Sequence, residues 1–469
     1  MTTLPPSKLP NVGTTIFTVM SRLAAECGAI NLSQGFPDFD PPRRLVDRVA
    51  EHMRSGRNQY APMAGWPPLC EAIAAKVEAL YGRRVSPADE VTVTSGGTEA
   101  LFCAVQAVVR PGDEVVLLEP AYDSYEPAVE LAGGRAVRVP LRARDHGVDW
   151  DRVRDALSSR TRLVIVNSPH NPSGAVLDAA DLQALADILR PTPALVLSDE
   201  VYEHMVFDGR VHQSVLGHPE LAGRAFVVSS FGKTYHATGW KVGYCVAPGP
   251  LTAEFRKIHQ FVQFAVATPM QAAFADFLAE CPAHHLDLPA FYQAKRDHFC
   301  RILADTPLSF VPSAGTYFQL ADYSAVSDLA DVEFARWLTR EIGVAAIPVS
   351  VFSASAPAAR VVRFCFAKHE STLDAAGERL RRLTRSRIHT CASRSSRPNS
   401  PGRSRPRTVT AWPRTSAVSP ATPTSSCSRR CSRRASAWMQ PGSPRKWGDP
   451  RWAGCARRPR RWAAWWREA

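Results

Sequence analysis

Seven short apolar or β-branched runs alternate with helical patterns between residues 45 and 273, and this alternation constrains the fold more than any other feature of the chain. Strands that alternate with helices usually pair in parallel, in a sheet covered on both faces. We therefore expect an α/β fold with a seven-stranded, mostly parallel sheet. The runs are EVTVT at 90, EVVLL at 114, RAVRV at 135, RLVIV at 162, ALVLS at 194, AFVVS at 225 and GYCVA at 243.

The pattern divides the chain into a large domain over 45–273 and a smaller α/β domain over 274–385, in which helix and strand patterns alternate. Residues 1–44 are Pro-rich and irregular apart from a short helical pattern, and we expect them to form an arm and part of the smaller domain. Two helices are predicted in the large domain or at its end. Asp178 would cap one, and the other would run from Ile258 to Phe277.

Polar residues follow two of the predicted strands, in TRLVIVNSPHNPSG and ALVLSDEVYEHM. Ligands bind at the carboxyl ends of the strands in a sheet of this kind. Asp199 is placed there to meet a protonated pyridine nitrogen, with Tyr202 three residues further on. An ionic hydrogen bond of this type contributes roughly 1.5 to 3 kcal/mol. The structural alternative for Asp199 is a helix N-cap.

The segment SFGKTYHATGWKVGY places Lys233 among small and hydroxyl residues directly after an apolar strand. A lysine amine forms an imine with an aldehyde cofactor, and the protein must then hold the cofactor's phosphate. Ser230 and Lys241 offer a hydroxyl donor and a point charge for this purpose. The alternative is a solvated lysine in a Gly-rich loop.

With these motifs the chain resembles the class I/II pyridoxal-phosphate-dependent aminotransferases of fold type I, and most of all the bacterial methionine aminotransferases and the kynurenine aminotransferases or glutamine transaminases K. The resemblance covers about residues 10–385. Besides the segments above it rests on INLSQGFPDF at 30, NQYAPMAGWPPL at 58, TVTSGGTEALF at 92, EPAYDSYEP at 119, AGTYF at 314, GVAAIPVSVF at 343 and VVRFCFAK at 361.

The resemblance implies that pyridoxal 5'-phosphate is the cofactor and that Lys233 forms the Schiff base with it. Asp199 would pair with the pyridinium nitrogen, and Tyr122 would stack on the ring. The remaining cofactor ligands implied by the resemblance are Tyr202 and Asn171 at the phenolic oxygen, Ser230, Lys241, Gly97 and Thr98 at the phosphate, and Tyr60, which would reach the phosphate from a partner subunit. Gly97 and Thr98 open a helical run, whose N-terminus attracts a phosphate.

On the same basis Arg363 would grip the substrate carboxylate bidentately, helped by Asn171 and the Gly35 backbone. Phe17 and Tyr60 would form walls of the side-chain pocket. The resemblance also implies a cis peptide bond between Asn171 and Pro172. Without it, Tyr122 and Tyr60 could be partly buried core aromatics, Gly96 and Gly97 a turn, and Arg363 the exposed face of an edge strand.

Residues 386–469 differ from the rest in composition. They hold 19 of the 57 Lys and Arg but 2 of the 44 acidic residues, and they contain no Leu, Phe or Tyr. The strongly basic balance of the whole chain therefore belongs to this tail, while residues 1–385 are mildly acidic. We predict a basic disordered tail, because it lacks a periodic apolar pattern. It could be an arm for nucleic acid or acidic membrane, but we favour translation of a shifted reading frame and expect no functional nucleic-acid partner.

The eleven cysteines show no C-x-x-C pair, which is typical of reduced thiols in the cytoplasm. No signal peptide and no window of 18 apolar residues is present, so neither secretion nor membrane insertion is expected.

The predicted activity is amino-group transfer from an amino acid to a 2-oxo acid by a homodimer. Methionine is the favoured donor, with aromatic amino acids, glutamine or histidine as further donors. The alternatives are a kynurenine transaminase, a cysteine-conjugate β-lyase and, remotely, a noncatalytic pyridoxal-binding regulator with a nucleic-acid-binding tail.

Overall fold

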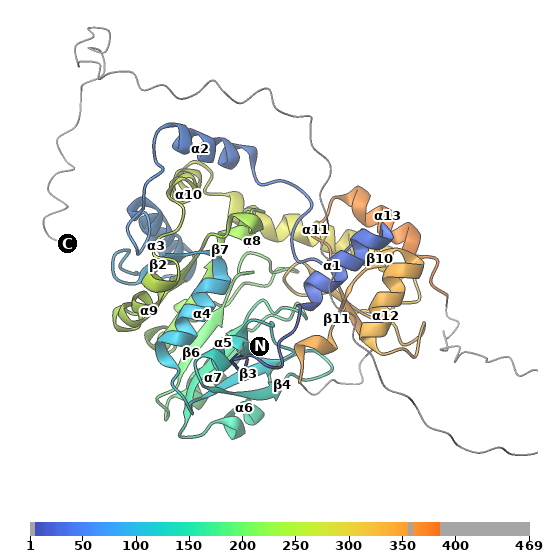
Figure 1. Ribbon diagram of the computed structural model, residues 1–469, viewed down its shortest axis with the longest axis horizontal. Coiled ribbons are helices and arrows are strands. Elements are labelled where there is room, and N and C mark those ends of the chain that lie inside the picture. The colour runs from blue at the N-terminus through green and yellow to red at the C-terminus, as the bar shows by residue number, and fades with distance from the viewer. Residues whose placement is uncertain (1–4, 355–359, 385–469) are drawn as a thin grey trace, which may run out of the picture. The chain divides into compact units, whose positions relative to one another are not determined.

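The computed structural model describes residues 5–354 and 360–384 (Figure 1). The tail predicted over 386–469 lies outside the described residues. Within them, no helix combines the length and the hydropathy that a membrane span requires.

A seven-stranded sheet forms the centre of the larger part of the fold, and all seven predicted runs contribute a strand to it. The strand order is β2-β8-β7-β6-β5-β3-β4. Strand β8 is antiparallel to both of its neighbours, and the other pairs are parallel. This confirms the predicted mostly parallel sheet. The strands are β2 (Val91–Thr94), β3 (Glu114–Glu119), β4 (Arg135–Pro140), β5 (Thr161–Asn167), β6 (Leu195–Asp199), β7 (Ala225–Ser230) and β8 (Gly243–Val246).

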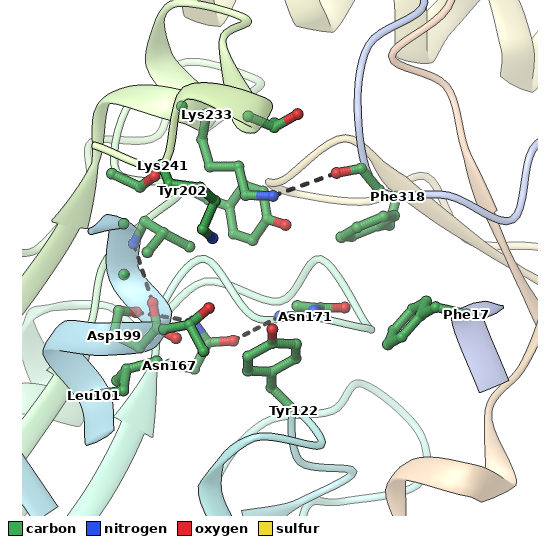
Figure 2. A pocket seen from close by; sticks show the side chains of 18 of the residues that line it. Phe17, Leu101, Tyr122, Asn167, Asn171, Asp199, Tyr202, Lys233, Lys241 and Phe318 are labelled. Atoms are coloured by element: carbon green, nitrogen blue, oxygen red, sulfur yellow. Dashed lines mark hydrogen bonds between the residues drawn. The ribbon is translucent and has the colours of Figure 1, made fainter. Parts of the chain in front are cut away.

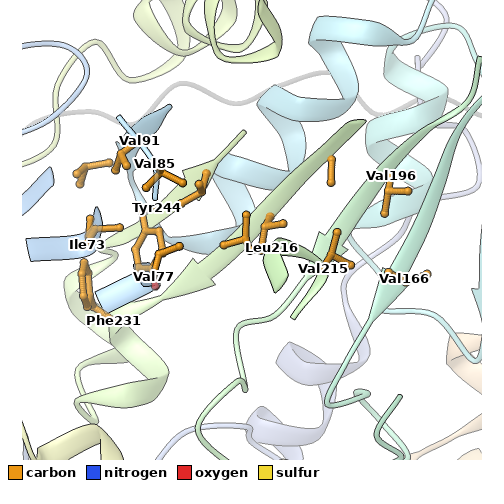
Figure 3. Packing of buried hydrophobic residues seen from close by; sticks show 14 of the residues in the cluster. Ile73, Val77, Val85, Val91, Val166, Val196, Val215, Leu216, Phe231 and Tyr244 are labelled. Atoms are coloured by element: carbon orange, nitrogen blue, oxygen red, sulfur yellow. The ribbon is translucent and has the colours of Figure 1, made fainter. Parts of the chain in front are cut away.

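Helices cover both faces of this sheet, as the continuous apolar strands require. On one face α4 (Gly96–Val108) packs against β7 and β8, and its Leu101 joins a buried cluster with residues of β3 and β5. The opposite face carries α3 (Pro67–Tyr81) and α7 (Ala179–Leu189). Figure 3 shows part of that second cluster, in which Ile73 and Val77 of α3 pack near Val91 and Tyr244 of the sheet.

A second core lies around a three-stranded antiparallel sheet of order β11-β12-β9. Residues from α1 (Ile16–Cys27) belong to this core together with residues from the C-terminal helices. Strand β1 (Ile30–Asn31) also pairs in parallel with β10 (Val344–Ala345). The N-terminal segment is thus built into the same packing unit as the C-terminal part. The domain boundaries at 44, 273 and 385 remain a prediction. The three strands are β9 (Phe318–Asp322), β11 (Ile347–Pro348) and β12 (Val361–Cys365).

The prediction of one helix from Ile258 to Phe277 is wrong. The chain forms α9 (Gly249–Val262) and α10 (Thr268–Glu280), separated by a short connection. Phe264 in this connection has a φ of 65°, which an α-helix does not contain, and Pro269 lies in the first turn of α10, where a residue without an amide hydrogen is tolerated. Asp178 does cap α7, in a capping box with Asp181.

The remaining α-helices range from 4 residues in α8 to 21 residues in α11. They are α2 (Arg43–Arg54), α5 (Tyr125–Leu131), α6 (Trp150–Ala156), α8 (Phe231–Thr234), α11 (His284–Ala304), α12 (Asp331–Trp337) and α13 (Glu370–Leu380).

Candidate active site

A cavity of about 320 Å³ lies at the carboxyl edge of the seven-stranded sheet and is closed on its other side by residues of β9 and β12. In Figure 2, Asp199 and Phe318 point into it from opposite sides. Of the predicted site residues, only Tyr60 is not part of its lining. Those that line it are Phe17, Gly35, Gly97, Thr98, Tyr122, Asn171, Asp199, Tyr202, Ser230, Lys233, Lys241 and Arg363.

Lys233 extends from the short helix α8 into the middle of the cavity. Its Nζ donates a hydrogen bond to the Gly35 carbonyl at 3.3 Å and lies 5.7 Å from the ring centres of Tyr202 and Tyr317. Burial and, to a smaller extent, the nearby Lys241 ammonium lower the pKa of the Lys233 amine to about 8. A larger share of the amine is therefore neutral near physiological pH than for an exposed lysine, as a nucleophile requires.

Asp199 is the last residue of β6, and no helix begins there, so the N-cap alternative is wrong. Its carboxylate accepts hydrogen bonds from Tyr125 Oη at 2.7 Å and from the Val201 amide at 3.3 Å. Burial raises the pKa of this carboxyl to about 6, although both hydrogen bonds favour the charged form. Asn167 Nδ2 donates to the Asp199 carbonyl at 2.8 Å and fixes the strand end.

The residues predicted to hold a phosphate come together at one end of the cavity. Ser230 ends β7, and Gly97 and Thr98 lie in the first turn of α4. Lys241 has a left-handed backbone with a φ of 52°. A Cβ added to Gly96 would lie 3.0 Å from Lys241 Nζ, so the glycine leaves room for the lysine beside the helix N-terminus. A positive charge and free amide groups at that point suit an anion.

Arg363 lies at the middle of β12, which is the central strand of its sheet, so the edge-strand alternative is wrong. The side chain is buried, and its guanidinium stacks 3.9 Å from the ring centre of Phe318. Nη1 donates to Asn171 Oδ1 at 2.6 Å and Nη2 to the Ser33 carbonyl at 3.2 Å. Within residues 5–354 and 360–384, Nε has no hydrogen-bond partner and no carboxylate forms an ion pair with this arginine.

Pyridoxal phosphate fits this set of groups. Lys233 lines the cavity and has no acidic hydrogen-bond partner in the part of the chain that the structure describes, and Asp199 offers an acceptor for a ring cation. The buried Arg363 retains an unpaired donor for a carboxylate. The peptide bond between Asn171 and Pro172, which supports this end of the cavity, is cis as the resemblance implied.

Tyr60 lies outside the cavity. It is 81% exposed, and its nearest aromatic neighbour is Phe264, with ring centres 5.2 Å apart. Three residues that shape the site were not predicted from the sequence, namely Tyr125, Asn167 and Phe318. The position of Asn167 at the end of a predicted strand was a signal that could have identified it. Tyr125 lies in a segment that was already singled out for Tyr122.

Comparison with known proteins links this geometry to one family. Residues 28–380 match the model of the family "Aminotransferase class I and II". Methionine aminotransferase of Escherichia coli is 56% identical over 380 residues, which cover 81% of this chain and 98% of that protein. Human kynurenine–oxoglutarate transaminase 1 is 36% identical, over 77% of this chain and 94% of its own length.

Solved structures agree with these matches. A crystal structure of an Escherichia coli protein described with a methionine aminotransferase function superimposes with a TM-score of 0.80 and 56% identity, covering 81% of this chain and 100% of the other.

Proposed function

The chain belongs to the class I and II aminotransferases, and on that premise we propose that it transfers the amino group of methionine to a 2-oxo acid. It is a pyridoxal-phosphate-dependent transaminase with the fold type I architecture. The observation that carries the choice of methionine is the 56% identity to the Escherichia coli methionine aminotransferase along nearly the whole length of that enzyme.

The cavity walls support an apolar, sulfur-containing side chain. Phe17, Tyr122 and Phe318 line the cavity near Arg363, and the guanidinium lies 5.4 Å from the ring centre of Phe17. A thioether makes favourable contacts with aromatic rings and adapts to irregular space. A methionine whose carboxylate is held by Arg363 would place its side chain among these rings.

When bound, pyridoxal phosphate supplies an aldehyde and an electron-poor ring that accepts electron density from the α-carbon of the substrate. Lys233 would bind the aldehyde, and Asp199 would hold the ring nitrogen in its protonated form. Ser230, Lys241 and the first turn of α4 would hold the phosphate. Tyr202 and Asn171 would donate to the phenolic oxygen.

Lys233 also has the properties of a general base. Its amine has a pKa of about 8 because burial and Lys241 oppose the charged form. A base with a pKa near the working pH takes up and releases a proton most effectively. Once its Nζ is free, Lys233 would remove the proton from the α-carbon of the amino acid and later return it on the cofactor side.

Arg363 orients the substrate for this transfer. Its guanidinium is fixed by Asn171, Ser33 and the Phe318 ring, so little side-chain freedom is lost when a carboxylate binds. A bidentate ion pair in a buried site restricts the rotation of the amino acid and brings its α-carbon towards Lys233.

We also propose that the protein is a cytoplasmic homodimer and has no nucleic-acid partner. Tyr60, Phe261 and Phe264 are exposed near the turn between α9 and α10, with Phe261 at 87%. A cluster of exposed aromatics is typical of an interface. Packing of this surface against a second copy would cover it and would carry Tyr60 towards the cofactor phosphate of the partner.

A panel of amino acids tested against several 2-oxo acids, with the purified holoenzyme, tests the choice of substrate. We expect methionine to give the highest kcat/KM, with the matching 2-oxo acid as its product. A kcat/KM for kynurenine about tenfold above that for methionine would support the second candidate, a kynurenine transaminase. That candidate rests on the 36% identity to the human enzyme. Pyruvate and ammonia formed from a cysteine conjugate would instead indicate β-elimination.

A further inference from the structure

Tyr125 contacts two residues of the cavity wall without lining the cavity itself. It is the first residue of α5, and its side chain is buried. Its hydroxyl donates to Asp199 Oδ2 at 2.7 Å, and its ring lies edge-on to that of Tyr122, with centres 5.6 Å apart and planes at 80°. The same side chain therefore supports both Asp199 and Tyr122, which approach the cavity from different elements.

The hydroxyl of Tyr125 has no other hydrogen-bond partner among the described residues. A phenylalanine would fill nearly the same space without placing a polar group in the core, where an unpaired hydroxyl is costly. Core packing alone thus does not explain the hydroxyl, whereas the Asp199 carboxylate does.

We propose that Tyr125 is a positioning residue for the transaminase reaction, which keeps the Asp199 carboxylate ionised and correctly oriented and fixes the ring of Tyr122. The inference rests on the proposed role of Asp199 at the ring nitrogen, and it does not depend on which amino acid is the donor.

The groups around Asp199 show why one hydroxyl has this influence. Lys233 faces the carboxylate from α8 and favours its charge, whereas Glu200, the next residue in the chain, opposes it. The hydroxyls of Tyr122 and Tyr202 are also near, but Tyr125 is the one that donates a side-chain hydrogen bond to the carboxylate within the described part of the chain. Burial raises the pKa of Asp199 to about 6, and the Tyr125 bond is the strongest influence against that rise.

Hydrogen bonds hold both carboxylate oxygens of Asp199 in place. Oδ2 is fixed by Tyr125 and Oδ1 by the Val201 amide, while Asn167 holds the backbone carbonyl of the same residue. Loss of the Tyr125 hydroxyl would leave the carboxylate with one weak bond at 3.3 Å and free to rotate about its last torsion. A rotating, more easily protonated acid is a poor partner for a ring cation.

The test is the affinity of the full-length enzyme for pyridoxal phosphate, measured between pH 5 and 9 by absorbance titration after dialysis. The cofactor should bind less tightly at low pH. In Tyr125→Phe this weakening should begin at a pH about one to two units higher than in the wild type, because one hydrogen bond to a charged group is lost. At neutral pH we expect roughly tenfold weaker binding. A role in packing alone would not shift the pH profile.

Two further variants make the result specific. Tyr292→Phe is the matched control, because it removes another buried tyrosine hydroxyl, which contacts His236 instead of Asp199, and it should leave the profile in place. In an Asp199→Asn background, Tyr125→Phe should have little additional effect, since there is no carboxylate left to stabilise.

These measurements test the role of Asp199 and the role of Tyr125 separately. If Asp199→Asn leaves cofactor affinity and its pH profile unchanged, the proposed role of Asp199 is wrong. If Asp199→Asn weakens binding but Tyr125→Phe gives the wild-type profile, or shifts it no more than Tyr292→Phe does, the role assigned to Tyr125 is wrong and that of Asp199 stands.

Discussion

Asp199 and Arg363 are two buried residues of opposite charge type that line one cavity, and both form hydrogen bonds with uncharged groups. Asp199 ends a parallel strand of the large sheet, and its side chain accepts hydrogen bonds from a hydroxyl and an amide. Arg363 lies in the middle of an antiparallel strand and donates to an amide oxygen and a carbonyl. Burial raises the pKa of the acid and lowers that of the arginine.

Neither charge has an oppositely charged hydrogen-bond partner among the described residues, and this feature distinguishes the site from a structural ion pair. The contrast within the same molecule is Lys76 with Glu203, which are both buried and bonded at 2.7 Å. A buried charge without a counterion is costly unless a ligand supplies one. The acid end of the cavity is therefore suited to a cation and the arginine end to an anion.

The largest expected effect comes from Lys233, which lies between the two charged ends. Lys233→Ala should abolish transamination and the visible absorbance of the bound cofactor, because the other lysine that lines the cavity, Lys241, lies at the proposed phosphate end. Absorbance spectra and single-turnover assays check this. Lys257→Ala, at an exposed lysine paired with Glu254, should keep normal activity. A Lys233→Ala enzyme that turns over at a near-normal rate would remove the basis for the proposed site.

The second largest effect is expected at Arg363, and it should distinguish the role of this residue from that of Asp199. Arg363→Lys should raise KM for the amino acid by about a hundredfold, because an ammonium cannot form the bidentate pair. Cofactor affinity should stay near that of the wild type, since the hydrogen bonds of Arg363 go to Asn171 and Ser33 and to none of the groups proposed for the phosphate or the ring nitrogen. Steady-state kinetics and cofactor titration measure the two quantities.

Arg256→Lys serves as the matched control for that experiment. Its guanidinium also donates to neutral acceptors, the Val91 carbonyl and Thr92 Oγ1, but it lies away from the cavity. Equal loss of substrate and cofactor affinity in Arg363→Lys would mean that Arg363 supports the fold or the phosphate instead.

The third expected effect is the influence of the Asp199 carboxyl on the free energy of unfolding. The pKa of Asp199 is about 6 in the folded protein and near 4 in an unfolded chain, so between these values the folded state binds more protons. The free energy of unfolding therefore falls as pH rises through this window and stays lowered above it. Asp199→Asn should stabilise the cofactor-free protein by roughly 2 to 3 kcal/mol at pH 8, with the gain disappearing below about pH 4.

Urea unfolding at pH 8 and pH 4 checks that expectation, with Asp199→Asn expected to lose cofactor affinity at the same time. A variant that is less stable than the wild type at pH 8 would indicate that the ionised carboxylate stabilises the fold, against the interpretation given for the acid end.

The smallest effect is expected from the tail. All proposed site residues lie before residue 385, so removal of residues 386–469 should leave kcat/KM within about twofold of the full-length value, a difference of under 1 kcal/mol in the barrier. A loss of more than tenfold would mean that the tail contributes to the site and would argue against translation of a shifted reading frame.

Much of this arrangement could be predicted from the sequence because parallel strands leave a strong local signal. Each buried strand is a short run of apolar residues, and its carboxyl end is the next polar residue, as in LVLSD ending at Asp199. The break near Phe264 was not predicted because apolar residues continue through it, although Pro269 was a sequence signal for the start of a new helix. The partners of the site residues were also hidden, since the bond from Tyr125 to Asp199 joins residues 74 apart in sequence.

The antiparallel direction of β8 also has a consequence for the order in which the site can assemble. Because β8 starts at the edge where β7 ends, Ser230, Lys233 and Lys241 reach that edge within a single short excursion of the chain. Closing a short loop costs little conformational entropy. The contact of Arg363 with Ser33 joins residues 330 positions apart and needs nearly the entire described chain. We expect the phosphate-binding segment to form early while the polypeptide grows, and the carboxylate-binding position of Arg363 to form much later.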